Sequence, residues 1–437
     1  MKRRARPGRA RVLKGGKDMK ELLAVRGGKP SIPDGAVKPW PPVDDDDRRM
    51  VLASLEGANH AFGPNCAAFQ EEFAAWNGNR YALTTNSGTA ALHMALVAAE
   101  CGCGDEVIVP AYSWSSSATC VMQHNALPVF VDIDFDTMNI DTSKIEAAVT
   151  SKTKAIIAVH LHGLPADMDA VMAIADKHGL KVIEDACQAH GARLRGRKVG
   201  TLGHCAAFSF NQNKCLSAGE GGMFVTDDED MSKRAQALWS FGEQAAPTGR
   251  RDYHVYAMGW MYRNSDLCAA WGRAQLRKLD WYLQVQQENA DCLTRELAGV
   301  PGLILPTAPD GYDHNWYNYT LRFDMAALGH AHDAPAFRDK IVSALRAEGL
   351  ETGIWQAFVL PAMTVFQAKD GYGHGCPWSC PHSRPMDYSV ADFPMATKHL
   401  ATHTGMTTPL RAPNGTEVAK LVAGAIKKVM TSLNQLE

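Results

Sequence analysis

The stretch Ala206-Ala-Phe-Ser-Phe-Asn-Gln-Asn-Lys214 places a lysine shortly after an apolar run. A glycine cluster, Gly219-Glu-Gly-Gly222, and a second apolar run, Met223-Phe-Val-Thr226, come next. Lysines usually keep their charge in water, so an exposed loop lysine is the simplest interpretation of these residues alone. A lysine in a cleft of low polarity instead loses its proton more easily and becomes a nucleophile toward aldehydes and ketones. The rest of the chain favours this second interpretation.

Strands and helices alternate along the chain before and after this lysine. Most of the expected strands are apolar at nearly every position, which is typical of strands buried on both faces. This alternation predicts a mostly parallel sheet with helices on both faces, and ligands bind such sheets beyond the carboxyl ends of the strands. Besides the two runs around Lys214, the expected strands cover residues 81–85, 106–109, 127–131, 154–159 and 180–184.

After residue 239 the pattern changes to longer helices and fewer strands. Helices are expected over 266–275 and 279–297, then a strand over 317–323 and helices over 334–348 and 418–433. We therefore expect a large α/β domain over residues 23–298, with its amino-terminal and linking helices, and a smaller α+β domain over residues 299–437. Residues 1–22 are too basic to pack, and we expect them to form a disordered arm.

The bulk composition excludes several classes of protein. With 437 residues and a formal net charge of −2, the chain gives no reason to expect nucleic acid as a partner. Its apolar stretches are too short to span a membrane, and its amino end lacks the apolar core of a secretory signal. The 11 cysteines are then expected to be reduced thiols in a cytoplasmic protein.

Three polar or aromatic groups follow expected strand ends and could share one cleft with Lys214. Ser87-Gly88-Thr89 opens a helix, where unpaired amides and the helix dipole suit a phosphate, although plain helix capping explains it equally well. Asp185 could pair with a protonated ring nitrogen, or it could cap a helix or bind an arginine. Trp114 could stack on such a ring, or it could belong to the core.

Two other patterns suggest metal sites. His160-Leu-His162 resembles a pair of metal ligands and motivates a metal-dependent hydrolase as a rival function. Cys376 and Cys380 have a spacing allowed in a zinc knuckle, but the sequence offers no second cysteine pair to complete one. We therefore expect no metal and interpret the 371–385 stretch, rich in Gly, Pro, His and Cys, as a functional loop that acts as a lid.

In this order and spacing the motifs are similar to those of the DegT-like sugar aminotransferases, which are fold-type I enzymes dependent on pyridoxal 5'-phosphate (PLP). The resemblance extends from about residue 25 to residue 433. It rests on four stretches, namely Asn86-Ser-Gly-Thr-Ala-Ala-Leu92, Glu184-Asp-Ala-Cys-Gln-Ala-His-Gly191, Ser209-Phe-Asn-Gln-Asn-Lys214 and Gly219-Glu-Gly-Gly222.

The resemblance implies a role for each site residue. Lys214 is the catalytic residue, which binds PLP covalently and later moves the proton between substrate and cofactor. Asp185 pairs with the pyridine nitrogen, and Trp114 stacks on the ring. The remaining cofactor contacts are Gln188 with the ring hydroxyl, and Gly88, Thr89 and Ser209 with the phosphate. Relatives with histidine in place of the lysine are dehydratases, so Lys214 favours transamination.

The resemblance also implies a homodimer with active sites at its interface. Relatives often carry Asn-Tyr-Arg where this chain has Met261-Tyr262-Arg263, and that asparagine reaches the phosphate of the neighbouring subunit. A methionine cannot donate this hydrogen bond.

The expected reaction is a ping-pong transfer of an amino group from glutamine or glutamate to a keto-cyclitol of the scyllo-inosose type. The stretches Val25-Arg-Gly-Gly-Lys-Pro30 and His162-Gly-Leu-Pro-Ala-Asp-Met168 and the loop around Cys376 look closer to the cyclitol branch of the family. A nucleotide-diphosphate keto-sugar is the alternative acceptor, and a PLP-binding regulator without turnover remains a different class of function.

Overall fold

The computed structural model describes residues 22–243 and 253–437. The arm predicted over residues 1–22 lies, except for its last residue, outside this part of the chain. Among the described residues, no helix has the length and apolar character needed to cross a membrane.

A seven-stranded sheet forms the centre of the molecule, in the order β1-β9-β8-β5-β4-β2-β3. Only β9 runs against the others, because it pairs antiparallel with both β1 and β8 while β8, β5, β4, β2 and β3 pair in parallel. This confirms the mostly parallel sheet, and the expected strands agree with those observed to within one residue at each end. The strands are β1 (Tyr81–Thr85), β2 (Glu106–Pro110), β3 (Leu127–Val131), β4 (Thr153–Val159), β5 (Lys181–Asp185), β8 (Cys205–Ser209) and β9 (Gly222–Thr226).

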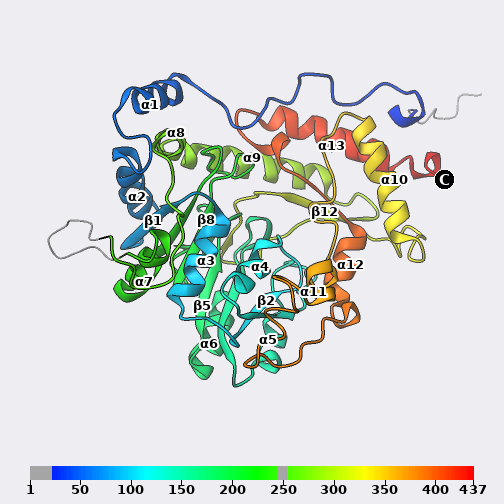
Figure 1. The fold of residues 1–437 in the computed structure, drawn as a ribbon. Helices are drawn as coiled ribbons and strands as arrows, with labels where there is room; N and C mark the ends of the chain where they lie inside the picture. The colour runs from blue at the N-terminus through cyan, green and yellow to red at the C-terminus, as the bar shows by residue number, and fades with distance from the viewer. Residues whose placement is uncertain (1–21, 244–252) are drawn as a thin grey trace, which may run out of the picture.

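Helices flank this sheet and connect its strands (Figure 1). Helix α3 begins where the Ser87 side chain accepts a hydrogen bond from the Ala90 amide, and α6 ends at Gly179, whose φ of 66° suits a residue without a side chain. The helices are α1 (Asp45–Glu56), α2 (Pro64–Asn77), α3 (Gly88–Ala98), α4 (Ser116–Gln123), α5 (Thr142–Ala148), α6 (Met168–His178), α7 (Glu229–Trp239), α8 (Asp266–Leu276) and α9 (Leu279–Leu297).

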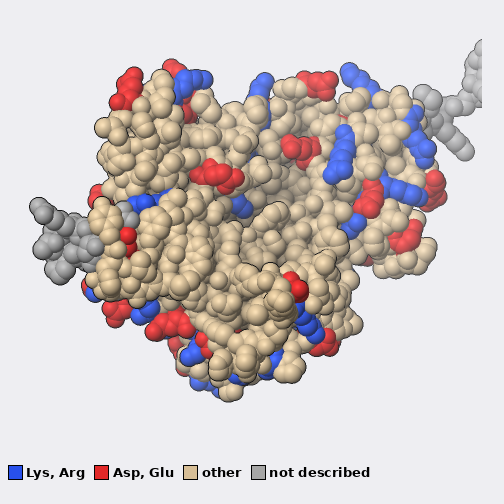
Figure 2. All heavy atoms as spheres, in the orientation of Figure 1, with Lys and Arg blue, Asp and Glu red and all other residues tan. Residues whose placement is uncertain are grey.

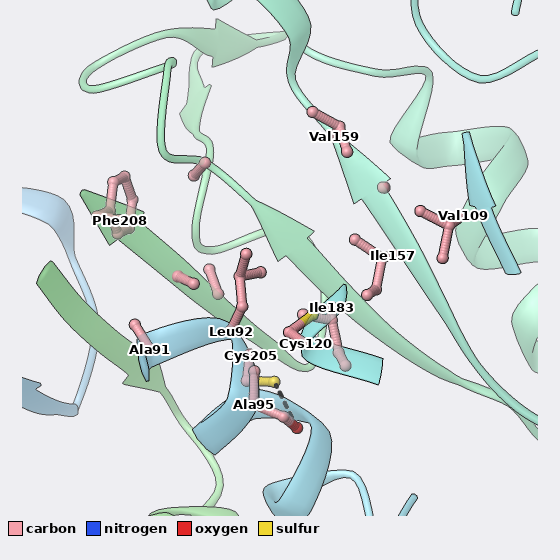
Figure 3. Packing of buried hydrophobic residues seen from close by; sticks show 14 of the residues in the cluster. Ala91, Leu92, Ala95, Val109, Cys120, Ile157, Val159, Ile183, Cys205 and Phe208 are labelled. Atoms are coloured by element: carbon pink, nitrogen blue, oxygen red, sulfur yellow. Dashed lines mark hydrogen bonds between the residues drawn. The ribbon is translucent and has the colours of Figure 1, made fainter. Parts of the chain in front are cut away.

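The core of this part of the chain is packed from small and branched side chains. Figure 3 shows Leu92 and Ala95 of α3 facing the sheet beside Cys205 of β8 and Ile183 of β5. The Cys205 thiol donates to the Ala95 carbonyl at 3.9 Å, which closes the helix onto the strand. The sheet is therefore rigid, and it fixes the positions of the residues that follow its strands.

The carboxyl-terminal elements form a second hydrophobic cluster together with α9. Its members include Leu293 of α9, Leu321 of β12, Ile341 of α10 and Ile426 of α13. The division at residues 298 and 299 stays a prediction. The elements are β10 (Leu303–Ile304), β12 (Tyr319–Phe323) and β13 (His403–Met406) in one sheet, β6 (Arg193–Leu194), β7 (Arg197–Lys198) and β11 (Tyr312–Asp313) in another, and α10 (Ala334–Ala347), α11 (Thr364–Ala368), α12 (Pro394–Thr402) and α13 (Thr416–Met430).

Part of the carboxyl-terminal chain returns to the large sheet instead of staying with this cluster. The rings of Phe366 and Tyr388 lie 5.0 and 5.4 Å from the ring of Phe130 on the edge strand β3. The Tyr388 hydroxyl donates to the Pro128 carbonyl of the same strand at 3.0 Å. Residues 366–388 therefore cover the edge of β3 that pairs with no other strand of this sheet.

Candidate active site

The candidate site lies at the carboxyl edge of the large sheet. Strands β1, β2, β5 and β8 all point the same way, so the residues that follow them meet at one edge. Figure 2 shows a hollow near the centre of this view, lined mostly by uncharged residues, with charged side chains gathered around the periphery.

Gly88 and Ser209 lie against each other at this edge. A Cβ atom placed on Gly88 would come within 2.7 Å of the Ser209 Cβ and within 3.0 Å of the Cys187 Sγ. Only glycine fits here, and the first amides of an α-helix such as α3 have no partner within the helix. The helix start and the end of β8 therefore form a cradle whose unpaired amides suit a phosphate group.

Hydrogen bonds tie two of the predicted residues, Thr89 and Asp185, to the start of α4. The Thr89 hydroxyl lies 2.8 Å from the Ser116 hydroxyl at the start of α4. The neighbouring Ser117 donates to the Asp185 Oδ2 atom at 2.6 Å, and the Cys187 amide donates to the Asp185 Oδ1 atom at 3.2 Å. Asp185 is only 5% exposed, so these donors hold its carboxylate in one orientation.

Lys214 lies half-buried between this carboxylate and the carboxyl-terminal part of the chain. Its Nζ atom is 4.8 Å from the centroid of the Tyr317 ring. Burial by itself lowers the pKa of Lys214, but Tyr317, Cys187 and Asp185 face the amine and raise that pKa above its ordinary value. The prediction that the lysine loses its proton more easily is wrong for the protein alone, because its neighbours stabilise the charged amine more than burial destabilises it.

Trp114 and Gln188 occupy different environments. Trp114 is 53% exposed, and its ring lies 6.1 Å from that of Trp355. A large apolar surface exposed beside polar site residues is suited to stacking against a flat ring. Gln188 is buried, and its Oε1 atom accepts a hydrogen bond from the His162 amide at 2.9 Å, which fixes its side chain beside the end of β4.

The sequence did not reveal four further residues of this site. Ser116 and Ser117 come shortly after Trp114, which was expected to follow a strand end, so the same rule could have placed both serines in the site. Tyr317 and Trp355 come from the distant carboxyl-terminal part of the chain, and no local pattern connects them with Lys214 or Trp114.

His160 and His162 do not form a metal site. The His160 Nδ1 atom accepts a hydrogen bond from the Ala166 amide, and its Nε2 atom lies 2.9 Å from the Glu184 carboxylate. His160 is thus fully bonded within the core. Within residues 22–243 and 253–437, no group of three or more His, Cys, Asp and Glu side chains could hold a metal ion.

The mostly parallel sheet with this site at its carboxyl edge is the architecture of the fold-type I PLP-dependent aminotransferases. The model of the DegT/DnrJ/EryC1/StrS aminotransferase family matches residues 41–402. The chain belongs to this family.

Three similar proteins illustrate the range of the family. GDP-perosamine synthase of Caulobacter vibrioides is 38% identical over 314 residues, which cover 71% of this chain and 82% of that protein. The "Putative L-glutamine:3-amino-2,3-dideoxy-scyllo-inosose aminotransferase" of Micromonospora echinospora is 37% identical over 343 residues, covering 76% and 79%. The structure of DesV from S. venezuelae in complex with a ketimine intermediate superimposes with a TM-score of 0.75 at 30% identity, covering 88% of this chain and 94% of that one.

The residues present fit PLP. The cradle at Gly88 suits its phosphate, the Asp185 carboxylate suits its ring nitrogen when protonated, and the Trp114 face suits its ring. When bound, PLP supplies the electron sink that stabilises negative charge on the carbon losing its proton.

Replacing Gly88 with alanine should weaken PLP binding. The new methyl group would overlap Ser209, and such overpacking costs about 1–3 kcal/mol. We expect the dissociation constant for PLP to rise about 10- to 100-fold, measured by equilibrium dialysis. Gly424→Ala in α13 is the matched control, because no atom lies within 4 Å of its new Cβ atom, and its PLP affinity should be unchanged. Equal affinities of the two variants would rule out the cradle.

Proposed function

We propose that this enzyme transfers an amino group from glutamine or glutamate to a keto-cyclitol of the scyllo-inosose type by a ping-pong mechanism. The observation that carries the proposal is the placement of the Lys214 amine beside the Asp185 carboxylate at the edge where Trp114 and the Gly88 cradle also lie. In this position the Lys214 amine takes a proton from one carbon of the substrate–cofactor adduct and delivers it to another. Such general acid–base catalysis raises the rate about 10²- to 10⁴-fold.

Uncharged residues next to Trp114 support a cyclitol as the acceptor. Trp355 lies 5.1 Å from the buried His162 ring, whose Nδ1 atom is 3.2 Å from the Asn318 amide nitrogen. Burial lowers the pKa of His162 well below its ordinary value, so the ring is neutral at pH 7. Neutral aromatic and amide groups suit a polyhydroxyl ring, whereas a nucleotide diphosphate needs cationic partners. The Micromonospora echinospora relative carries an inosose in its name.

A nucleotide-diphosphate keto-sugar is the second candidate acceptor. GDP-perosamine synthase, at 38% identity, favours it. Since the acceptor pocket decides between ligands by shape and hydrogen bonding, a direct comparison of the two substrate classes is needed.

Spectral titration of the PLP-loaded enzyme tests the function. Glutamine or glutamate should remove the visible absorbance of the bound cofactor, and a keto-cyclitol should restore it without further donor. Restoration by a nucleotide keto-sugar alone would select the second candidate. If no amino donor changes the spectrum, the protein is a PLP-binding regulator and the proposed reaction is excluded.

We also propose that a second copy of the chain covers the segment next to the Gly88 cradle. The segment consists of residues 253–262. The Asn86 amide donates to the Tyr262 carbonyl at 2.9 Å, so the segment lies next to the start of α3. Its exposed apolar side chains include Tyr253 (75%), Met258 (72%) and Met261 (50%), a concentration typical of an interface between protein subunits. Sedimentation velocity should give twice the mass of one chain, and a monomer at all concentrations would contradict the dimer.

A further inference from the structure

Two cysteines far apart in the sequence meet at the amino edge of the large sheet. Cys103 lies in the loop between α3 and β2, and Cys380 lies in the 371–385 loop. Their Sγ atoms are 3.0 Å apart, across 277 positions of sequence. Cys103 is exposed and Cys380 is partly exposed, so a small molecule in solution can reach the pair.

Contacts that do not involve sulfur hold the two cysteines together. The Lys152 side chain donates to the His382 carbonyl at 2.8 Å, and Arg384 forms an ion pair with the buried Glu106 at the first position of β2. Gly104 packs so closely on His382 that an added Cβ atom would lie 2.6 Å from the His382 Cβ. The chain therefore fixes the position of the thiols before any bond forms between them, which removes most of the entropic cost of joining them.

The surroundings give the two thiols different reactivity. The hydrogen bond from Cys103, followed by those from the His382 and Ser383 amides, lowers the pKa of Cys380. The same contact with Cys380 raises the pKa of Cys103. Cys380 is therefore the thiol that ionises first, and a thiolate is the nucleophile in thiol–disulfide exchange.

We propose that Cys103 and Cys380 form a reversible disulfide that fastens the 371–385 loop to the sheet, with a low-molecular-weight disulfide such as oxidised glutathione as the oxidant. The Cys380 thiolate attacks one sulfur of the oxidant and expels one thiolate. Cys103 then loses its proton and attacks the Cys380 sulfur of the mixed disulfide, expelling the second thiolate. The protein loses two hydrogens and two thiols are released, so the oxidant is reduced by the two electrons that the cysteines give up.

The third cysteine of this region serves as a control for the pairing. The Cys376 Sγ atom lies 3.7 Å from the Ser379 hydroxyl of its own loop, and not against Cys103. The described residues also provide no three-ligand metal group at this place. A bond between Cys103 and Cys380 is thus the arrangement that the observed contacts favour.

The disulfide should leave the aminotransferase reaction unchanged. Cys103 precedes β2, whereas Trp114 follows it, so the bond and the candidate active site lie at opposite ends of the strand. The bond instead secures the far end of the segment that covers β3. The inference therefore stands apart from the proposed function, and its test needs no substrate.

Mass spectrometry of the full-length protein tests the proposal. After incubation with oxidised glutathione, the intact chain should be lighter by about 2 Da. After alkylation of the remaining free thiols and digestion, we expect a crosslinked peptide pair that contains Cys103 and Cys380. Cys376→Ser should give the same pair, and Cys103→Ser should instead stop at a glutathione adduct on Cys380. Trypsin should also cleave the oxidised protein more slowly after Lys369 than the reduced protein.

Three results would overturn the proposal. The first is that the thiols of Cys103 and Cys380 can both still be alkylated after treatment with oxidised glutathione. The second is a pair formed by Cys376 with Cys380, and the third is a stable glutathione adduct on Cys380 in the unsubstituted protein. Dithiothreitol should restore both thiols. If it does not, the bond is not reversible, and this fourth result would also overturn the proposal.

Discussion

Replacing Lys214 with alanine should abolish transamination and remove the visible absorbance of the PLP-loaded enzyme. The substitution removes both the covalent attachment point and the group that moves the proton, so turnover should fall by more than the roughly 10²- to 10⁴-fold that general acid–base catalysis contributes. The fold should survive, because the side chain is half-buried and packs against the Tyr317 ring instead of filling the core. Absorbance spectra, single-turnover kinetics and circular dichroism measure the three effects.

Lys198→Ala is the matched control for this variant. Lys198 is also partly buried, and its Nζ atom lies 3.9 Å from the Trp76 ring centroid, so it shares the contact type of Lys214 without its position in the site. This variant should keep its colour and its turnover. Borohydride reduction of the unsubstituted holoenzyme should leave the cofactor on the peptide that contains Lys214. A coloured and active Lys214→Ala enzyme, or labelling of another lysine, would refute the assignment.

The central sheet was predictable because its strands are buried on both faces. Near-continuous apolar runs such as Leu127–Val131 leave little choice other than a strand between helices, and the observed β3 has the same bounds. The carboxyl ends of parallel strands then place Asp185 and Ser209 at one edge. Both steps need only local sequence and a rule of topology.

The role of the 371–385 loop was not predictable in this way. We expected a lid over the site, but the loop packs at the amino edge of the sheet, where Arg384 pairs with Glu106 and Cys380 meets Cys103. The lid prediction is therefore wrong. Glycine, proline and cysteine content indicates a loop, but the distant ion pair that decides where the loop lies has no signal in the local sequence.

The charge state of Lys214 shows a second limit of the sequence. Its setting between a strand and a glycine cluster left an exposed loop lysine as the simplest interpretation, and only the other motifs of the chain favoured an enclosed one. The sign of its pKa shift depends on Tyr317, which arrives from another part of the fold, and on Asp185, whose orientation depends on Ser117. Composition around a residue predicts burial better than it predicts the balance of charges on it.

Asp185→Asn and Glu184→Gln should have opposite effects, although the residues are neighbours. Successive side chains of a strand point to opposite faces. Asp185→Asn keeps the shape but removes the negative charge that would keep the cofactor nitrogen protonated, so kcat should fall about 10²- to 10⁴-fold. Its free energy of unfolding should fall less than that of Glu184→Gln, because the Ser117 hydroxyl can turn and accept a hydrogen bond from the new amide. Stopped-flow kinetics and denaturant unfolding measure the two quantities.

Glu184→Gln should instead destabilise the fold and spare the chemistry. Glu184 is fully buried, and its carboxylate accepts hydrogen bonds from the amides of Gly200, Leu202 and Gly203 and contacts His160. Because the His160 Nδ1 atom accepts a hydrogen bond from the Ala166 amide, the proton is on Nε2, which donates a hydrogen bond to the Glu184 carboxylate. The NH₂ group of a glutamine cannot accept these hydrogen bonds, so some of the buried donors would lose their partner. This should lower the free energy of unfolding by about 2–4 kcal/mol. If this variant lost as much turnover per folded molecule as Asp185→Asn, the charge of Asp185 would not be the cause.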